Sequence, residues 1–297
     1  MLSLFDGIGC GKVALERVGV KIDKYFASEI KQCAIKCATI NNPDIIEIGD
    51  VFNVHYKDGI LKTEKGDFDV GQIDILIGGS PCQDFSCANV FKRSSDYGLN
   101  GDKSRLFYEY LRLKKEIEPK YFLLENVKMK KSSEKELNDY MGVDGIHINS
   151  SLVSYQTRPR IYWTNIPIVG SLEDKHISFQ NNKDKDFQRL EESKVHKTPC
   201  RIRMWNNGMG RYALGNCENI THKDKIGCLT RKQDRSPNSG LIAYGDFCRF
   251  LTRREIEGAQ TLPVGYTDML TYRQVQDVCG EGWTIDVIVF LMRGLKS

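Results

Sequence analysis

Residues Met1–Gly9, MLSLFDGIG, form a short apolar run that ends in a glycine turn. A helical pattern follows, with Val13, Leu15 and Val18 at its apolar positions, and it stops at Gly19. A strand that passes through such a turn into a helix is typical of α/β sheets, and its glycines let a ligand approach the backbone closely.

The same alternation continues along the first part of the chain. Further strand-like runs cover residues 25–28, 45–48, 73–77 and 121–124, and helical patterns lie after them, through residues 33–38 and 104–113. Alternating strands and helices predict a mostly parallel sheet covered on both faces. We therefore predict a Rossmann-like α/β fold, followed by a smaller loop-rich domain.

Polar side chains follow the predicted strands at their carboxyl ends, and these are Asp6, Glu29, Asp50, Cys82 and Glu125. Ligands of open α/β sheets bind at that edge. An isolated carboxylate there is often only a helix cap. Five polar side chains along one edge favour a single ligand-binding cleft.

The first two strand ends indicate a nucleoside ligand. Glu29 ends the second strand, where a carboxylate suits the diol of a ribose. The loop after the first strand lacks both G-x-G-x-x-G and G-K-[ST], so a ligand with little phosphate, such as S-adenosylmethionine, fits better than a dinucleotide. Asp50 would accept a hydrogen bond from the adenine amine. The predicted cofactor-binding residues here are Phe5, Asp6, Gly7, Gly9, Glu29, Ile30, Asp50 and Val51.

Cys82 follows Ser80-Pro81 directly, at the end of the fourth predicted strand. A thiol in such a constrained and accessible loop can act as a nucleophile if its thiolate is favoured. Taken alone, a cysteine is more often a buried structural residue.

The composition excludes several other classes of protein. The 297 residues are 40% hydrophobic and 28% charged, as in ordinary globular domains, and no stretch is long and apolar enough to span a membrane. The chain start lacks the features of a signal peptide, so we expect a cytoplasmic protein with reduced thiols among its 10 cysteines. Without a C-x-x-C pair or a second ligand pair near His196 and Cys200, we expect no metal site.

The positive charge is concentrated in the middle of the chain. Residues 166–250 carry 15 basic and 10 acidic side chains, whereas residues 1–165 carry 23 of each. Such an excess alone is more often a solvated face than a binding surface. The strand–helix rhythm also stops there, so we predict domains at 1–165, 166–248 and 249–297, the last packing back on the first as helices.

The chain resembles the DNA cytosine-5 methyltransferase family. It contains that family's motifs in order, as F-D-G-I-G at 5–9, G-S-P-C-Q-D-F-S at 79–86, E-N-V at 125–127, Q-T-R-P-R at 156–160 and R-F-L-T-R-R-E at 249–255. Ala27-Ser28-Glu29 and Leu262–Asp268 look closest to the catalytic domains of animal de novo methyltransferases. The compact length suggests a bacterial or phage modification enzyme.

The resemblance implies an S-adenosylmethionine-dependent enzyme that methylates C5 of a flipped-out cytosine in a specific short DNA sequence. Cys82 would add to C6 of the ring, and Glu125 would offset the negative charge that builds there. Arg158 and Arg160 would contact the base and a nearby phosphate and favour the Cys82 thiolate. Pro81 and Trp283 would line the cofactor site.

In this family, the region between the fourth and fifth motifs recognises the DNA target. Here it spans about residues 166–248, which carry the positive excess. Gln83 and Ser86 on the catalytic loop, and Arg211 and Arg231 in the recognition region, are the predicted DNA-binding residues. We expect double-stranded DNA as the partner of a monomer.

Two alternatives remain from the sequence. The tRNA-acting branch of the family has Phe-Thr after its cysteine, where this chain has Gln83-Asp84, and this favours DNA. A catalytically silent DNA-binding subunit of the same fold would lack the thiol or the glutamate, and both are present. The chain departs from the family at Gly258-Ala259, where Arg-Leu is usual, and at Glu281, where Asn is usual.

Overall fold

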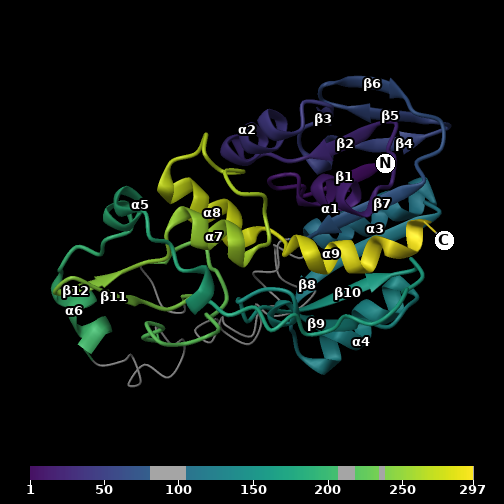
Figure 1. The fold of residues 1–297 in the computed structure, drawn as a ribbon. Coiled ribbons are helices and arrows are strands. Elements are labelled where there is room, and N and C mark those ends of the chain that lie inside the picture. The colour runs from purple at the N-terminus through teal and green to yellow at the C-terminus, as the bar shows by residue number, and fades with distance from the viewer. Residues whose placement is uncertain (81–104, 207–217, 234–237, 297) are drawn as a thin grey trace. The chain divides into compact units, whose positions relative to one another are not determined.

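Seven strands form one sheet in the order β3-β2-β1-β7-β8-β10-β9 (Figure 1). The computed structural model describes residues 1–80, 105–206, 218–233 and 238–296. The sheet strands are β1 (Leu2–Leu4), β2 (Tyr25–Ser28), β3 (Ile45–Glu47), β7 (Ile75–Gly79), β8 (Tyr121–Val127), β9 (Ile146–Asn149) and β10 (Pro159–Thr164). β1, β2, β3, β7 and β8 are parallel, and β10 is antiparallel to β8. The predicted parallel α/β sheet is confirmed.

Helices cover both faces of this sheet because successive strand residues point to opposite sides. α1 (Cys10–Val18) begins after Gly9 and ends at Gly19, and it packs so closely that a Cβ on Gly11 would lie 2.4 Å from Ile77. The neighbouring Leu76 points the other way, into a core shared with α3 (Arg105–Ile117) and α4 (Lys131–Met141). α2 (Gln32–Asn41) connects β2 to β3.

A small antiparallel sheet lies between β3 and β7 in the chain. It consists of β4 (His55–Lys57), β5 (Ile60–Thr63) and β6 (Gly66–Asp69), and it follows the short 3-10 helix η1 (Val51–Asn53). Phe68 packs its ring against Phe26 of β2, with centroids 5.2 Å apart, and Leu61 is fully buried. The sequence pattern did not predict this sheet, because charged residues interrupt its apolar alternation.

β8 is longer than predicted. The apolar run ends at Leu124, yet the strand continues through Glu125-Asn126-Val127, where it pairs with β10. Glu125 lies opposite Tyr162, and Val127 lies opposite Arg160. The motif at 125–127 is therefore held within a strand and not in a loop after it.

The described residues of the region from 166 to 250 form short elements, namely η6 (Gln180–Asn182), α5 (Phe187–Glu192), α6 (Pro199–Asn206), β11 (Ile242–Tyr244) and β12 (Phe247–Arg249). The 3-10 helix η5 (Ser150–Leu152) precedes this region. The predicted C-terminal helices are confirmed as α7 (Arg253–Ala259), α8 (Tyr272–Glu281) and α9 (Ile285–Met292), after which η7 (Arg293–Lys296) completes the described chain.

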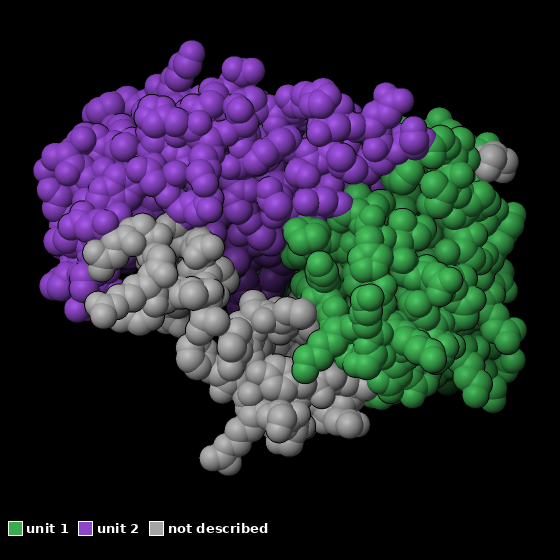
Figure 2. All heavy atoms as spheres, turned by 90° about the horizontal axis from the view of Figure 1, so that it is seen from below, with its two compact units in different colours: residues 1–148, 159–170, 288–297 green, residues 149–158, 171–287 purple. Residues whose placement is uncertain are grey.

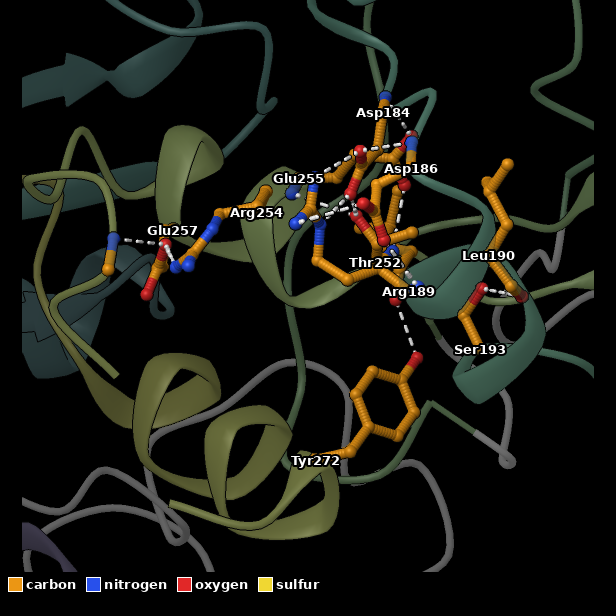
Figure 3. A network of polar contacts seen from close by, with 12 residues as sticks. Asp184, Asp186, Arg189, Leu190, Ser193, Thr252, Arg254, Glu255, Glu257 and Tyr272 are labelled. Carbon is orange, nitrogen blue, oxygen red and sulfur yellow. Dashed lines mark hydrogen bonds and ion pairs between the residues drawn. The ribbon is translucent and has the colours of Figure 1, made fainter. Parts of the chain in front are cut away.

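A buried polar network surrounds the start of α7 (Figure 3). Thr252 and Glu255 form a capping box, in which the Glu255 carboxylate accepts from Thr252 N at 2.8 Å. Arg249 donates to both Glu255 oxygens, at 2.7 and 2.8 Å, and Thr252 Oγ1 donates to Asp184 at 2.8 Å. The motif at 249–255 is thus explained by packing, because Arg249 and Glu255 are only 3% and 0% exposed.

The chain divides into two units, which Figure 2 colours separately. Unit 1 comprises residues 1–148, 159–170 and 288–297, and unit 2 comprises residues 149–158 and 171–287. This division differs from the predicted one at three places: residues 149–158 and 249–287 group with unit 2, and residues 166–170 group with unit 1. Of the predicted C-terminal segment 249–297, only residues 288–297 belong to unit 1, where Gly294 packs tightly against Pro167.

In the described part of the chain, none of the helices combines the length and the apolar character needed to cross a membrane.

Candidate active site

The candidate site lies at the edge of the sheet where β1 and β7 are neighbours. The chain proceeds from β1 outward to β2 and β3 on one side, and from β7 to β8 on the other, so the order switches between β1 and β7. Ligands of open α/β sheets bind at such a switch point, at the carboxyl ends of the strands. The pairing register places Leu4 beside Ser28 and Gly78, and Gly79 beside Glu125. The residues that follow these strands therefore share one edge.

The loop after β1 has an unusual backbone. Phe5, Gly7 and Gly9 all have positive φ angles, of 57°, 64° and 77°. Such angles favour glycine, so Phe5 carries strain of the kind that concentrates at functional sites. Apart from its chain neighbours, no atom of the described residues lies within 4 Å of the position that a Cβ on Gly7 would take, so this backbone is open on its side toward the rest of the described chain.

Asp6 is not available to a ligand in the way the sequence suggested. Its side chain turns inward, where Oδ1 accepts hydrogen bonds from Ser3 at 2.5 Å and from Tyr25 at 2.6 Å. Asp6 is only 9% exposed, and burial raises the pKa of its carboxyl to about 6. The predicted contact of Asp6 with a cofactor would therefore involve its backbone or Oδ2, and not Oδ1.

Glu29 connects the loop after β1 to the start of α2. One carboxylate oxygen accepts from Gly7 N at 2.9 Å, and the other accepts from Ile30 N and Lys31 N at 2.8 and 2.9 Å. The oxygen that faces Gly7 has a lone pair left for a hydroxyl group. Ile30, the next residue, is 67% exposed, which offers an apolar surface beside this carboxylate.

Asp50 caps η1 by accepting from Phe52 N at 3.1 Å. Val51 was predicted to contact the cofactor, but its side chain belongs to the buried core. The exposed apolar residue of this turn is Phe52. The turn thus directs the side chain of Val51 inward and leaves that of Phe52 outside, so the predicted contact of Val51 with the cofactor would involve its backbone.

Glu47 is a half-buried acidic residue that the sequence pattern did not single out. Both of its carboxyl oxygens, and Oδ2 of Asp6, are buried without a hydrogen-bond partner among the described residues. Burial, followed by the nearby charges of Asp6 and Glu29, raises the pKa of Glu47 to about 8. Glu47 is the last residue of β3, and this position at a strand end is the sequence feature that could have identified it.

Glu125 and Arg160 form an ion pair at the carboxyl end of β8. Arg160 Nε lies 2.8 Å from Glu125 Oε1, and both side chains are nearly buried. The antiparallel pairing of β8 with β10 brings them together, since Arg160 stands two residues before the partner of Glu125. Two of the predicted catalytic residues are thus adjacent in the structure.

Asn126 is completely buried behind this pair. Its Nδ2 donates to Ser80 Oγ at 3.1 Å, and its Oδ1 accepts from Val127 N at 2.8 Å. Ser80 is the last described residue before Pro81-Cys82. The bond therefore attaches the start of that segment to β8.

Arg158 does not join the ion pair of Glu125. It belongs to unit 2 and is 3% exposed, and its guanidinium donates to the carbonyls of Leu229, Gly280 and Gly282 at 3.1, 3.1 and 2.9 Å. A fourth bond goes to Cys228 Sγ at 3.3 Å. These bonds use four of its five donors and leave the one on Nε for the predicted contact with the base or a phosphate.

Comparison with known proteins identifies the family. The family described as C-5 cytosine-specific DNA methylase matches residues 1–204, more than half of the chain. The chain belongs to this family. The resemblance stated from the motifs is therefore confirmed, and the fold is that of a methyltransferase of this family.

Individual relatives match this chain over shorter stretches. An orphan methyltransferase, M.Rho11sI of Bacillus phage rho11s, is 37% identical over 130 residues, which is 43% of this chain and 23% of that relative. The type II methyltransferase M1.ScrFI of Lactococcus lactis subsp. cremoris is 36% identical over 135 residues, 46% of this chain and 30% of that relative. The chain thus matches less than a third of the length of these relatives.

A solved structure matches the whole fold. Spodoptera frugiperda DNMT2, as a triple mutant, superimposes with a TM-score of 0.66, covering 100% of this chain and 99% of its own at 15% identity. At this identity the likeness supports the fold of the chain.

Some predicted site residues lie outside the described part of the chain, namely Pro81, Cys82, Gln83, Ser86 and Arg211. Two others lie in unit 2. Trp283 is half-buried and follows Gly282, whose carbonyl binds Arg158. Arg231 pairs with Asp277 at 2.7 Å and with Glu281 at 3.1 Å, so the residue at 281 that departs from the family motif has a partner.

Among the residues that the structure describes, no group of three or more His, Cys, Asp or Glu side chains could hold a metal ion.

Proposed function

We propose that this protein transfers a methyl group from S-adenosylmethionine to C5 of a flipped-out cytosine in a short double-stranded DNA sequence. The observation that carries the proposal is the Glu125–Arg160 ion pair of 2.8 Å, beside the strand end that leads to Pro81-Cys82. A carboxyl group and a guanidinium at that position supply the charges that addition to a pyrimidine ring requires.

The sheet edge fits an adenosyl methyl donor. The backbone at Gly7 is open toward the rest of the described chain, and Glu29 keeps one acceptor position for a ribose hydroxyl. Ile30 and Phe52 are exposed apolar side chains on the two adjacent turns, suited to the faces of an adenine. No bound phosphate is required, because the loop has no phosphate-binding glycine pattern.

The chemistry begins with Cys82. Its thiolate adds to C6 of cytosine, which breaks the conjugation of the ring and makes C5 a nucleophile. Glu125, protonated or sharing a proton with N3, neutralises the charge that develops on the ring. Arg160 orients Glu125, contacts the base carbonyl and favours the thiolate. When bound, the donor supplies an electrophilic methyl group; C5 then loses its proton, and Cys82 is eliminated as the thiolate.

Two buried residues position this machinery. Asn126 holds Ser80 and thereby the entry to the Cys82 segment. Arg158 holds the carbonyls on both sides of Glu281, next to Trp283, which we propose covers the cofactor.

The proposed partner is DNA. A cytosine that is paired in a duplex must flip out of it to reach the edge of the sheet described above. The region at 166–250 carries the basic excess, and unit 2 has a groove of about 350 Å³ lined by Arg231, Lys232 and Arg273. Gln83 and Ser86 would fill the space left by the base, and Arg211 and Arg231 would contact the duplex. The proposed setting is the cytoplasm of a bacterium or a phage-infected cell, with a monomer acting on DNA.

Transfer of labelled methyl groups tests this proposal. The protein is incubated with labelled S-adenosylmethionine and, in parallel, with duplex DNA and with tRNA, and the product nucleosides are identified. We expect 5-methylcytosine in DNA alone, and bisulfite sequencing then gives the target sequence. Label in tRNA alone would establish the tRNA-acting alternative, and DNA binding without transfer on any duplex would establish a silent subunit.

A further inference from the structure

The turn after β3 is held from several sides within unit 1. From β2, Ser28 Oγ donates to the carbonyl of Gly49 at 2.7 Å. Gly49 has a φ of +86°, and Asp50 and Phe52 follow it. The turn carries the carboxylate and the exposed ring that we assign to the adenine end of the donor, so its shape determines where these two groups point.

Glu64 holds this turn from the small antiparallel sheet. It lies at the tip of the β5–β6 hairpin, and its Oε2 accepts from Asn53 Nδ2 at 3.0 Å. Its side chain also lies over Gly49, where a Cβ would be 1.9 Å from Oε1 and 2.4 Å from Cδ. Only a glycine at 49 leaves room for the carboxylate in this position.

Arg112 holds the same turn from α3. Its Nη2 donates to the carbonyl of Val54 at 2.8 Å and, at 3.4 Å, to that of Val51. Its Nη1 pairs with Glu116 at 2.7 Å, and Glu116 in turn accepts from Tyr56 N at 2.9 Å. The guanidinium therefore fixes both ends of η1 to a helix.

We propose that Glu64 and Arg112 are positioning residues for the methyl donor, because they fix the turn from Gly49 to Val54 that presents Asp50 and Phe52. Neither side chain contacts the donor. This inference rests on the proposed function, since it assigns a task to the small sheet at the same donor site. A turn held before binding loses less conformational entropy when the ligand arrives.

The location of Glu64 separates this role from general stability. Glu64 and Asn53 are both exposed, so their bond orders the turn at the surface and does not act on the core of unit 1. Its loss should loosen the turn and leave the core of unit 1 intact. The expected effect is therefore on donor affinity and not on the melting temperature.

The first experiment measures the Kd for S-adenosylhomocysteine by calorimetry with the whole protein. For Glu64→Ala we expect a Kd about fivefold higher, the effect of one ordinary hydrogen bond, with kcat at saturating donor unchanged. Glu64→Gln keeps an acceptor for Asn53 and should restore the Kd to within about twofold. Lys65→Ala, on the same hairpin tip, serves as the matched control and should have the parent Kd.

Two further variants test the contacts at Gly49 and at α3. Gly49→Ala forces Glu64 aside, so its effect on Kd should be smaller in the Glu64→Ala background, whereas backbone strain at 49 contributes equally to both. Arg112→Lys keeps the charge next to Glu116 but loses the forked contact to two carbonyls, and should raise Kd by a similar factor.

The outcomes distinguish this inference from the proposed function. If the parent protein methylates DNA and binds the probe, but Glu64→Ala binds with the same Kd, the inference is overturned and the function stands. If Glu64→Ala lowers the melting temperature and kcat together without changing Kd, the residue is merely structural. If the parent binds no S-adenosylhomocysteine, the proposed function itself fails.

Discussion

Asn126 in β8 donates a hydrogen bond from its side-chain amide to the hydroxyl of Ser80 at the end of β7, at 3.1 Å. The two strands are parallel neighbours, with Gly79 opposite Glu125, so the bond joins the residues that come just after that pair. It connects the strand that carries Glu125, the proposed catalytic carboxyl, to the segment that contains the proposed nucleophile. The distance between Glu125 and Cys82 should therefore be sensitive to the hydrogen bond between Asn126 and Ser80.

Removing this contact should reduce catalysis more than stability. For Asn126→Ala we expect kcat to fall about 10- to 100-fold, because small misplacements of reacting groups have effects of this size. Ser80→Ala should change kcat in the same direction, and the double variant should be no worse than Asn126→Ala alone. Steady-state kinetics with saturating donor measure these values. Independent effects of the two substitutions would show that the bond has no catalytic role.

The Glu125–Arg160 pair should act as a unit. Glu125→Gln and Arg160→Gln should each lower kcat by at least about 100-fold, since each removes a group that stabilises charge on the ring. Arg160→Lys should not restore the rate, because the single ammonium of lysine cannot pair with Glu125 as Nε does and also present the further donors of a planar guanidinium. Arg17→Gln, an exposed site on α1, is the control. A normal rate in Arg160→Gln would remove this residue from the mechanism.

Arg249 and Glu255 should affect stability. Arg249→Met leaves the Glu255 carboxylate buried without its two-pronged partner, and the free energy of unfolding should fall by about 3 to 5 kcal/mol. Urea unfolding measures this loss. The exposed pair of Lys197 and Asp246 provides a comparison, because Lys197→Met should change the stability by no more than about 1 kcal/mol. Equal effects at the two sites would contradict a buried ionic network.

The buried carboxyl groups of Asp6 and Glu47 predict a dependence of stability on pH. The folded protein raises the pKa of Asp6 to about 6 and that of Glu47 to about 8, so the folded state holds protons that the unfolded chain releases. Their contribution to stability is fully present below about pH 4 and is lost as the pH rises to about 8. Between pH 5.5 and pH 8.5, the melting temperature of Glu47→Gln should therefore fall less than that of the parent protein. Parallel pH profiles of the two proteins would refute this assignment.

The sequence predicted the parts of the fold that depend on local patterning. Apolar runs gave the positions of β1, β2 and β3, and the glycines at 9 and 19 gave both ends of α1. The small sheet at 55–69 was not predictable in this way, because its strands are short and largely exposed. Its stability comes from contacts such as Phe68 with Phe26, which are distant in the chain.

The site was predictable to the extent that strand ends determine it. Glu29 and Glu125 lie at the edge where the strand pattern placed them, whereas the pairing of Arg160 with Glu125 depends on the antiparallel strand β10, which the pattern did not predict. The inward orientation of Asp6 and Val51 depends on the local twist of two turns, which residue types do not specify. The burial of Arg158 depends on carbonyls about 70 and 120 positions further along the chain, and no motif contains that information.

The central claim is that the sulfur of residue 82 bonds to the pyrimidine ring during the reaction. Replacing the target cytosine in a duplex by 5-fluorocytosine blocks release, so with S-adenosylmethionine the protein should form a stable adduct whose peptide mass assigns the DNA to Cys82. Cys82→Ser should form none, and Cys200→Ser, at an exposed cysteine, should form as much as the parent protein. An undiminished adduct in Cys82→Ser, or 5-methylcytosine formed by that variant at the parent rate, would contradict the account.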